Sequence, residues 1–565
     1  MHMTLPLKKS IALFHPQGNF SRPNNFFGKD VANLGLFKAL IRYGDFKEVS
    51  LLNQIGLSRE NADAELLELT SRIELNCVPT FDTLAPSRCG TLLRGQPYLS
   101  ELAWMRCNAH LDNAYSLVGL IHTIAPPFIR ELIGAAAVAP TYQWDALICT
   151  SPAVKHSMEI MFDSFAAHMA NRFGAVRNPR PQLPLIPLAV DTEAMGHKRT
   201  DLESRAEFRK RFSIDSDDIV VLWVGRLSYF EKAFPQSMIE AVQLASKNCK
   251  SRLHFLMAGW FPGGDDDLRL YKQAADLLAP ELNLIALNGN DSSLVDKCWA
   301  AADIFISLVD NIQETFGITP VEAMAAGLPV VVSDWDGYRY TVRDQVDGIL
   351  IPTLASAGGD LGYLLSMLHS LEVETYQTYV GAVAQHTAVH VQKAAAAIAQ
   401  LASNSQQRIT MGEAGRRRAL DMFSWPVVVD LYKQLFDELA QRRLTVEPSF
   451  ASNAPRLNPL RGEPFRDFTH FATHVIEPSL RLRLSQGSKA SNLEACLLVQ
   501  LNTFYPGLRG SPEDAMKLLF ALEESGPQGL LVDELLENIS SQRKPYLENT
   551  LVWMAKLGLI DWLPS

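Results

Sequence analysis

Short runs of apolar residues alternate with amphipathic stretches along most of the chain. In the first part, the runs "IALF", "SLVGLIHTIA", "WDALICTS" and "LPLIPLAVD" predict buried strands, the second ending near His122. A stretch from about Lys29 to Tyr43 is compatible with a helix. Short buried strands that alternate with helices are typical of a parallel sheet covered on both faces.

The alternation restarts after a charged segment, "DTEAMGHKRTDLESRAEFRKRF". Five runs predict further strands: "DIVVLWVG", "RLHFLMAG", "LNLIALNG", "AADIFISL" and "GLPVVVSD". An amphipathic helix, "FPQSMIEAVQLASK", follows the first of them, and one or two closing helices end near residue 445. We therefore expect two Rossmann-like, doubly wound domains, over residues 1–195 and 196–445.

The remaining residues differ in character. Residues 446–480 are read as a linker because their first part is rich in Pro, Ser and Asn. Residues 481–565 predict a small, mostly α domain whose order of helices and a short strand resembles a winged-helix module. From Ala451 to the end there are 11 Lys/Arg and 13 Asp/Glu, so the net charge is −2. This charge argues against nucleic acid as a partner, and we expect a protein-interaction or dimerisation role, with packing against the chain's own domains as the alternative.

Composition narrows the class of protein. Of the 565 residues, 47% are hydrophobic, which excludes a disordered chain, and the formal net charge of −10 disfavours general nucleic-acid binding. Seven widely spaced cysteines without a Cys-x-x-Cys pair favour neither a disulfide framework nor a structural zinc site. The sequence shows neither a signal peptide nor an apolar run of about 20 residues, so we expect a cytoplasmic protein, with basic helix faces that could contact the inner face of a membrane.

Ligands of such sheets bind beyond the carboxyl ends of the strands, and we expect a cleft between the two domains there. In "QETFGITPVEAMAAGLPVVVSD", Thr319 and Pro320 predict a helix start, which would put Glu322 in its first turn and Glu314 in the loop before it. Free N–H groups at that helix start suit a phosphate, and Gly317 permits close approach.

A cationic element follows an earlier strand. Arg226 comes directly after Gly225, and Lys232 follows six residues later in "VGRLSYFEKAF". A guanidinium and an ammonium beside a helix N-terminus would stabilise the charge of a departing diphosphate.

These motifs resemble those of family 4 glycosyltransferases of the GT-B fold. The resemblance is carried, in order, by "PLIPLAVDT", "VGRLSYFEK", "ALNGNDSSLVDKCWAAADIFISL" and "ETFGITPVEAMAAGLPVVVSDWDGYRYTVRDQVDGILIP". It spans about residues 10 to 445 and is strongest in the second domain. The chain departs from the family at Ala233, where glycine is usual, and in the first loop, which has only Gly18.

The resemblance implies a retaining transfer of a sugar from a nucleotide-diphosphate sugar, such as a UDP or GDP sugar, without metal or further cofactor. Glu314 would bind the donor sugar, Glu322 the ribose, and Arg226 with Lys232 the diphosphate, while His122 would lie near the anomeric centre. The donor would also contact the backbone at Gly225, Phe316, Gly317, Ile318 and Thr319 and the loop of Asn288, Gly289 and Asn290. Further candidates for the pocket are His15, Gly18, Asp310 and Asn311.

Several alternatives stay open. His122 could simply be hydrogen-bonded to backbone. For Trp335, Asp336 and Tyr338, packing and turn roles compete with sugar contact. The chain could instead be another GT-B enzyme, an epimerase or a phosphorylase, or a catalytically idle scaffold. The acceptor could be a glycan, a lipid-linked sugar or a protein, with polysaccharide assembly as the default.

Overall fold

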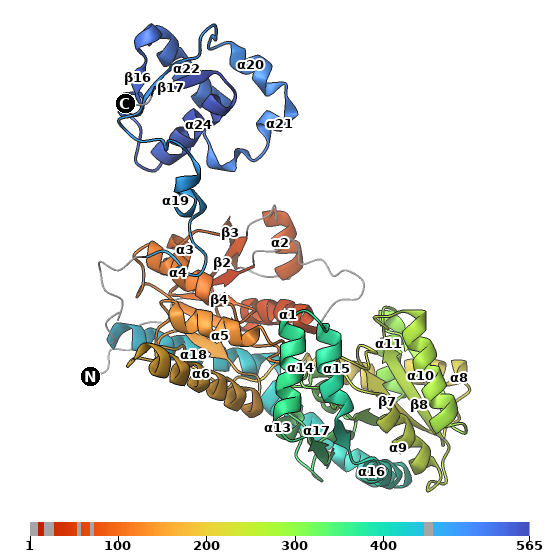
Figure 1. Cartoon of the computed structure of the whole chain (residues 1–565). Helices are drawn as coiled ribbons and strands as arrows, with labels where there is room; N and C mark the ends of the chain where they lie inside the picture. Colours follow the sequence, from red (N-terminus) through yellow and green to blue (C-terminus); the bar gives the residue numbers. More distant parts are fainter. Residues whose placement is uncertain (1–9, 16–27, 54–57, 68–72, 446–455, 564–565) are drawn as a thin grey trace. The chain divides into compact units, whose positions relative to one another are not determined.

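The computed structural model describes residues 10–15, 28–53, 58–67, 73–445 and 456–563 (Figure 1). The chain divides into two compact units, Met1–Asn458 and Pro459–Ser565. Gly18 and the first ten residues of the expected linker lie outside the described residues.

A six-stranded parallel sheet forms the first half of the larger unit, with the order β3-β2-β1-β4-β5-β6. Its strands are β1 (Ser10–Phe14), β2 (Glu48–Asn53), β3 (Glu74–Pro79), β4 (Thr91–Arg94), β5 (Ser116–Leu120) and β6 (Ala146–Ile148). Three of the four predicted strands are confirmed, while β2, β3 and β4 were not predicted.

The prediction of a strand at "LPLIPLAVD" was wrong. The structure gives this segment isolated bridges, from Leu185 to Cys149 and from Val190 to Ser424, and Gln182 just before it bridges to Ala146. Pro184 and Pro187 lack the N–H groups that a continuous ladder beside β6 requires.

The second half repeats the architecture, with the strand order β12-β11-β10-β7-β8-β9 and parallel pairing throughout. Its strands are β7 (Ile219–Val224), β8 (Leu253–Gly259), β9 (Asn283–Asn288), β10 (Ile304–Ser307), β11 (Val330–Ser333) and β12 (Gly348–Ile351). All five predicted strands are present, and β12 adds an edge. The two doubly wound sheets confirm the expected GT-B class of fold.

Helices cover both sheets. Those up to the second sheet are α1 (Gly28–Tyr43), α2 (Arg59–Leu66), α3 (Leu84–Cys89), α4 (Ser100–Asn108), α5 (Ile129–Val138), α6 (Pro152–Phe173), α7 (Thr192–Thr200) and α8 (Leu202–Arg211). Those that follow are α9 (Gln236–Ser246), α10 (Asp265–Leu278), α11 (Ser292–Ala301), α12 (Ile318–Ala325), α13 (Tyr338–Thr341), α14 (Asp360–Ser370), α15 (Tyr376–Gln385), α16 (Val391–Ser403), α17 (Ser405–Phe423) and α18 (Trp425–Thr445). A short antiparallel pair, β13 (Thr353–Ala355) and β14 (Thr387–Val389), carries α14 and α15.

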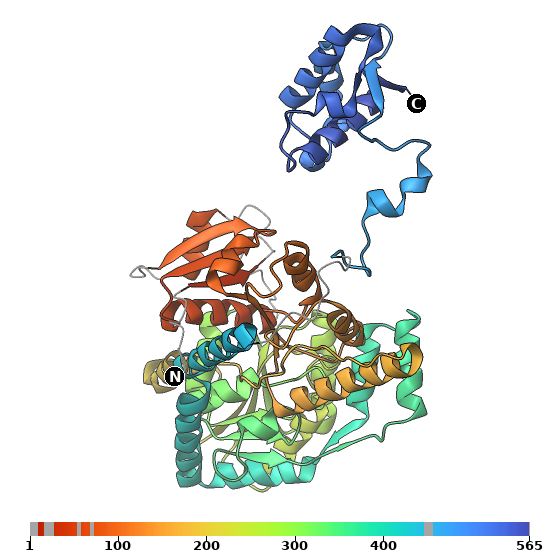
Figure 2. The ribbon, with the colours of Figure 1, turned by 90° about the vertical axis from the view of Figure 1, so that its left-hand side faces the viewer.

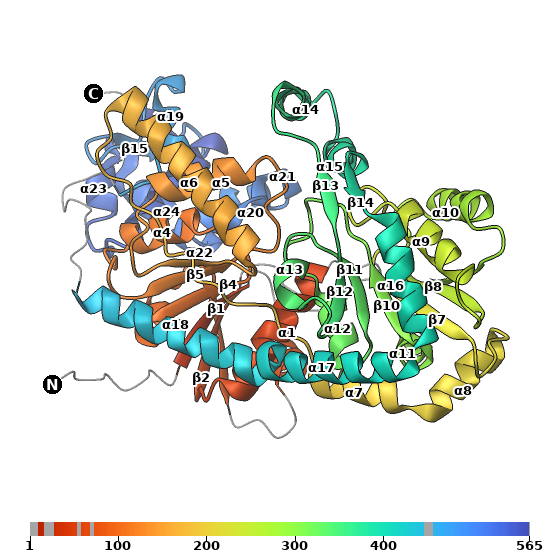
Figure 3. The same cartoon turned by 90° about the horizontal axis from the view of Figure 1, so that it is seen from below.

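The two faces of the first sheet are covered by different helices. On β1, Ile11 and Leu13 pack into one apolar cluster, whereas Ala12 and Phe14 pack into another, as the alternation of side chains along a strand requires. The first cluster also holds Val429 and Tyr432 of α18, although we expected this helix to close the second domain. Figure 3 shows α18 beside the first sheet, so the end of the expected second domain supports the first.

Both sheets reverse their strand order at one place, between β1 and β4 in the first and between β7 and β10 in the second (Figure 3). Ligands of doubly wound sheets bind at such switch points. The loop after β7 carries Arg226 and Lys232, and the loop after β10 carries Glu314. The topology therefore explains why two motifs far apart in the sequence come together.

The smaller unit combines helices with a three-stranded antiparallel sheet of order β16-β15-β17 (Figure 2). Its α-helices and strands are α19 (Pro464–Asp467), β15 (Arg481–Leu484), α20 (Asn492–Leu497), α21 (Gln500–Thr503), α22 (Pro512–Ser525), β16 (Leu530–Leu531), α23 (Val532–Leu535), α24 (Lys544–Lys556) and β17 (Ile560–Leu563). Three short 3-10 helices complete it: Thr469–Phe471, Pro506–Leu508 and Gly526–Gln528. Leu482, Leu519 and Met554 belong to its own apolar core. The helices were expected, but the sheet has two more strands than the single one predicted.

Across the described residues, no helix combines the length and the apolarity that crossing a membrane would require.

Candidate active site

The carboxylate of Glu314 lies at the head of α12. Its Oε1 accepts hydrogen bonds from the backbone N–H groups of Thr315 at 3.2 Å and Gly317 at 3.1 Å, and a longer one from Phe316 at 3.5 Å. Its Oε2 lies 3.1 Å from Nζ of Lys232. The two strand-end loops thus meet in one ion pair. Two of the N–H groups that were predicted to face the donor, those of Phe316 and Gly317, donate to Glu314 itself.

This environment keeps Glu314 ionised. Burial raises the pKa of the carboxyl group, but the charge of Lys232 and the backbone hydrogen bonds together outweigh burial, so the pKa is below its ordinary value. The Glu314 side chain is only 12% exposed, whereas that of Lys232 is 35% exposed. The ammonium and the N–H groups are arranged to bind an anion, and in this structure the anion is the carboxylate of Glu314.

Arg226 is paired differently. Its guanidinium lies 2.6 Å from Oε2 of Glu231, and both side chains are largely buried. Burial lowers the pKa of Arg226, and the charge of Glu231 opposes this effect. Tyr376 of α15 lies nearby, because both charges act on its hydroxyl, and it donates a hydrogen bond to Oε1 of Gln313 at 3.0 Å. Tyr376 therefore brings α15 beside the Arg226–Glu231 pair.

Asp310 and Asn311 hold the two loops together. The Nδ2 of Asn311 donates to the backbone oxygen of Phe230 at 2.6 Å, and its Oδ1 accepts from Gln313 N at 2.8 Å. Both carboxylate oxygens of Asp310 accept from Phe234 N at 3.4 Å. Burial raises the pKa of Asp310 to about 8. These contacts fix the Lys232 loop against the Glu314 loop. That the two residues also line the pocket stays a prediction.

Replacing Asn311 by alanine should therefore loosen the site without removing any charge. We expect a loss of about 1–3 kcal/mol of unfolding free energy, since buried partners are left unsatisfied. A nucleotide diphosphate should bind about tenfold more weakly, which corresponds to about 1.4 kcal/mol. Thermal unfolding and calorimetric titration measure the two effects; unchanged binding in a folded variant would contradict the positioning role.

Helix α12 begins earlier than predicted. Its N-cap is Gly317, at φ 86°, and a Cβ there would lie 2.0 Å from the Tyr338 ring, so only glycine fits. Thr319 and Pro320 lie inside the helix, and Glu322 is in its second turn rather than its first. Burial raises the pKa of Glu322, and the charge of Lys198 opposes the rise.

Three glycines lie close together at the carboxyl ends of neighbouring strands. Gly225, Gly259 and Gly289 follow or end the neighbouring strands β7, β8 and β9, and Gly289 N donates to Gly259 O at 2.8 Å. A Cβ on Gly259 would come within 1.8 Å of Gly225 O, and one on Gly289 within 2.7 Å of Gly259 Cα. The loop of Asn288 to Asn290 follows β9. Within it, Asn290 N donates to Asn288 Oδ1 at 3.0 Å.

His122 reaches the second domain through its backbone. Thr315 Oγ1 donates to His122 O at 2.7 Å, so the first-domain strand end touches the Glu314 loop. The Nε2 of His122 lies 2.9 Å from both Asn33 Oδ1 and Gly95 O. Two acceptors around Nε2 indicate that this nitrogen carries a proton. His15, by contrast, is at the end of β1, where its backbone oxygen accepts from Asn53 Nδ2 at 3.0 Å.

Sequence reasoning did not single out Asn33, Glu231 or Ser151 as site residues, and it left Asp336 undecided. Ser151 Oγ donates to Asp336 Oδ1 at 3.2 Å, joining the first domain to the loop after β11. Glu231 lies next to Lys232 in the motif, but the motif does not show that its partner is Arg226, because tertiary packing brings these two side chains together. The signal for Asp336 was its place after a predicted strand end.

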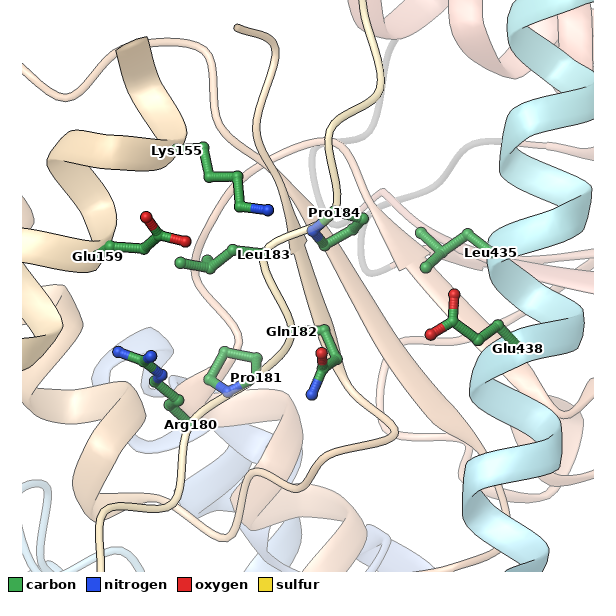
Figure 4. Close-up of a pocket in the computed structure, with 9 residues that line it drawn as sticks. All are labelled: Lys155, Glu159, Arg180, Pro181, Gln182, Leu183, Pro184, Leu435 and Glu438. Carbon is green, nitrogen blue, oxygen red and sulfur yellow. The ribbon is translucent and has the colours of Figure 1, made fainter. Parts of the chain in front are cut away.

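A separate surface cavity of about 360 Å³ lies between α6, residues 180–184 and α18. It is lined by Lys155, Glu159, Arg180 and Glu438, with Leu435 and the segment Pro181–Pro184 (Figure 4). None of the predicted site residues lines it. Within the described ranges, no group of three or more His, Cys, Asp or Glu side chains is placed to hold a metal ion.

Comparison with known proteins agrees with these motifs. Residues 204–357 match a family model described as "Glycosyl transferases group 1". The chain is 26% identical over 189 residues to an uncharacterized glycosyltransferase of Methanocaldococcus jannaschii, covering 31% of this chain and 45% of that protein. It is 30% identical over 233 residues to a D-inositol 3-phosphate glycosyltransferase of Thermobifida fusca, covering 40% and 49%. The chain thus spans less than half the length of these two relatives.

Solved structures show a distant likeness. A crystal structure of HepE from Anabaena, in complex with UDP and glucose, aligns with 76% of this chain and 99% of that chain, at 16% identity and a TM-score of 0.49. A sucrose-phosphate synthase from Thermosynechococcus elongatus aligns with 77% and 99%, at 16% identity and a TM-score of 0.46.

Proposed function

We propose that this protein transfers a sugar from a nucleotide-diphosphate sugar to an acceptor, with retention of the anomeric configuration. The observation that carries the proposal is the cluster at the head of α12, where Lys232 and three backbone N–H groups converge on one carboxylate. Such convergent donors stabilise a leaving anion. The family match over residues 204–357 covers both loops of this cluster.

In the proposed reaction, the bond between the anomeric carbon and the diphosphate oxygen breaks. The acceptor oxygen forms the new bond on the same face, and its proton passes to the leaving diphosphate. Lys232, Arg226 and the head of α12 would bind the diphosphate, while Glu314 turns to the sugar hydroxyls. His122 would lie near the anomeric carbon. These groups supply the positive field that a metal supplies elsewhere, so we propose a metal-independent reaction without a further cofactor.

The acceptor is proposed by class only: a glycan, a lipid-linked sugar or a protein, with polysaccharide assembly as the first choice. Some relatives are named for D-inositol 3-phosphate, so phosphorylated polyols belong in the acceptor panel. We place the reaction in the cytoplasm, with contact to the inner membrane face if the acceptor is lipid-linked.

The direct test is turnover of the full-length chain with UDP and GDP sugars in EDTA. Slow hydrolysis by water should release the nucleoside diphosphate, and NMR should show the anomer of the donor as the first sugar product. The opposite anomer would refute retention. Activity that appears only with a divalent metal would refute metal independence.

An idle scaffold is the competing outcome. A folded protein that neither binds nor turns over any nucleotide sugar, and whose cellular function survives both Glu314→Ala and Arg226→Ala, would support it. An interconverted nucleotide sugar would indicate an epimerase, and release of a sugar phosphate would indicate a phosphorylase.

For the C-terminal unit we propose protein interaction or dimerisation, on the winged-helix-like order of its elements. Large apolar side chains support this role: Leu498 is 87% exposed, Leu501 76% and Tyr505 91%. The mass of the full chain in solution, by light scattering, tests self-association. A monomer at all concentrations would leave a different protein as the partner.

A further inference from the structure

Asp336 occupies an unusual backbone position. It follows β11, and its φ of 40° lies in the left-handed region that favours glycine. An aspartate there is strained, by a cost that glycine would avoid. Strain that persists in a folded protein calls for a compensating contact.

That contact comes from the first domain. Ser151 caps α6, accepting from Val154 N at 3.2 Å, and donates its own proton to Asp336 Oδ1 at 3.2 Å. The carboxyl group of Asp336 therefore lies beside the N-terminus of a long helix. Serine as the N-cap supplies both hydrogen bonds with one hydroxyl.

The same seam contains the contacts of the Glu314 loop. Thr315 Oγ1 donates to His122 O at 2.7 Å, and Thr150 Oγ1 donates to Thr315 O at 3.5 Å. Two neighbouring first-domain strand ends, those of β5 and β6, thus bind the loops after β10 and β11. Of these three hydrogen bonds, the one between Ser151 and Asp336 has an ionisable side-chain group as its acceptor.

We propose that Ser151 and Asp336 form a latch between the two domains that positions the Glu314 loop against His122. This inference rests on the proposed sugar transfer: Asp336 is a positioning residue, which acts through the seam and not on the donor. When the bond forms, the domains close and the Glu314 loop is held for reaction; when it is absent, the loop is free to move.

The stability of the latch depends on whether Asp336 is protonated. The groups that face its carboxyl are Ser151 on α6, Glu314 after β10, and Gly337 N–H and Tyr338 beside it. Burial first, and then the charge of Glu314, raise the pKa of Asp336 to about 7. Closure therefore takes up a proton: the latched form is most stable at acid pH and weakens as pH rises to about 7, above which it is constant.

The test compares Asp336→Gly and Asp336→Asn with Asp334→Asn, a control whose carboxylate pairs with Arg339 at 3.0 Å. Glycine should not lower the melting temperature, because it relieves the backbone, yet amide exchange at residues 150–156 and 313–318 should rise at least fivefold. Turnover of UDP-glucose or GDP-mannose, whichever the wild type accepts, should fall at least tenfold in kcat. The control should match the wild type in melting temperature, amide exchange and kcat.

Asparagine keeps the acceptor oxygen but cannot ionise. At pH 5.5, the amide exchange of Asp336→Asn should equal that of the wild type. Between pH 5.5 and 7, the ratio of wild-type to variant kcat/KM should fall by up to about tenfold per pH unit. Unchanged exchange in Asp336→Gly would overturn the latch. If the wild type turns over no nucleotide sugar, the proposed function fails, and the exchange measurement still decides the latch.

Discussion

Replacing Glu314 by glutamine is expected to reduce sugar transfer by about 100-fold while leaving nucleotide-diphosphate binding intact or tighter. A charged hydrogen bond to a sugar hydroxyl contributes about 1.5–3 kcal/mol, and glutamine lacks the charge. In the free protein the same carboxylate occupies Lys232 and the N–H groups of the α12 head. Its neutralisation removes an internal competitor of the diphosphate. Steady-state kinetics and calorimetric titration separate the two effects.

Glu322→Gln provides the matched contrast, since it makes the same change eight residues later on α12. If Glu322 binds the ribose, its replacement should weaken nucleotide binding about tenfold, the opposite signature. Weaker binding in Glu314→Gln by more than tenfold would contradict the idea that Glu314 is a displaceable anion. Undiminished transfer would remove Glu314 from the reaction altogether.

Lys232→Ala is expected to lower kcat/KM by about 100- to 1000-fold, the range seen when one charge-stabilising donor is removed. It also leaves the buried carboxylate of Glu314 without its cation. Because the lysine side chain is partly exposed, we expect a loss of only about 1–2 kcal/mol in the free energy of unfolding. That loss should shrink as acid protonates Glu314 in both proteins. Kinetics and urea unfolding at pH 4 and pH 7.5 measure these effects.

Two comparisons make the Lys232 result specific. Lys272→Ala, on the exposed side of α10, should leave kcat/KM and the free energy of unfolding unchanged. The double variant Glu314→Gln/Lys232→Ala should unfold at nearly the same denaturant concentration as Glu314→Gln, because the paired charge is already gone. Full additivity of the two stability losses would show that the 3.1 Å ion pair is not formed in solution.

The sequence predicted the sheets well where apolar runs were long and uninterrupted. All five predicted strands of the second sheet are present; β8, β10 and β11 are buried on both faces, whereas β9 alternates between buried and exposed residues toward its end. In the first domain, β2 and β3 carry polar residues such as Glu48 and Asn76, which hid them. The segment at residues 183–191 failed for the opposite reason: its run is apolar, but Pro184 and Pro187 interrupt it, and it pairs through isolated bridges and not through a continuous ladder.

The candidate site, like the fold, could be predicted only in part from the sequence. Motif spacing identified Glu314 and Lys232, and the switch point of the second sheet brings them together. It could not show that Glu314 binds its own loop, that Arg226 pairs with Glu231, or that Asn311 ties the loops, because partners chosen by tertiary packing leave no local pattern. The role proposed for Asp336 rests on its backbone angle and on a contact 185 residues away in sequence, neither of which a local pattern reveals.

The central claim is that the loops after β7 and β10 bind a nucleotide diphosphate. Its most direct test is thermal unfolding of the full chain with UDP, GDP and their sugars, in EDTA, for the wild type and Lys232→Ala. A ligand at 100 times its Kd should add about 2.7 kcal/mol of stability. We predict a metal-free stabilisation with one base that Lys232→Ala abolishes. A folded wild type that responds to none of these ligands, or a variant that responds equally, would contradict the account.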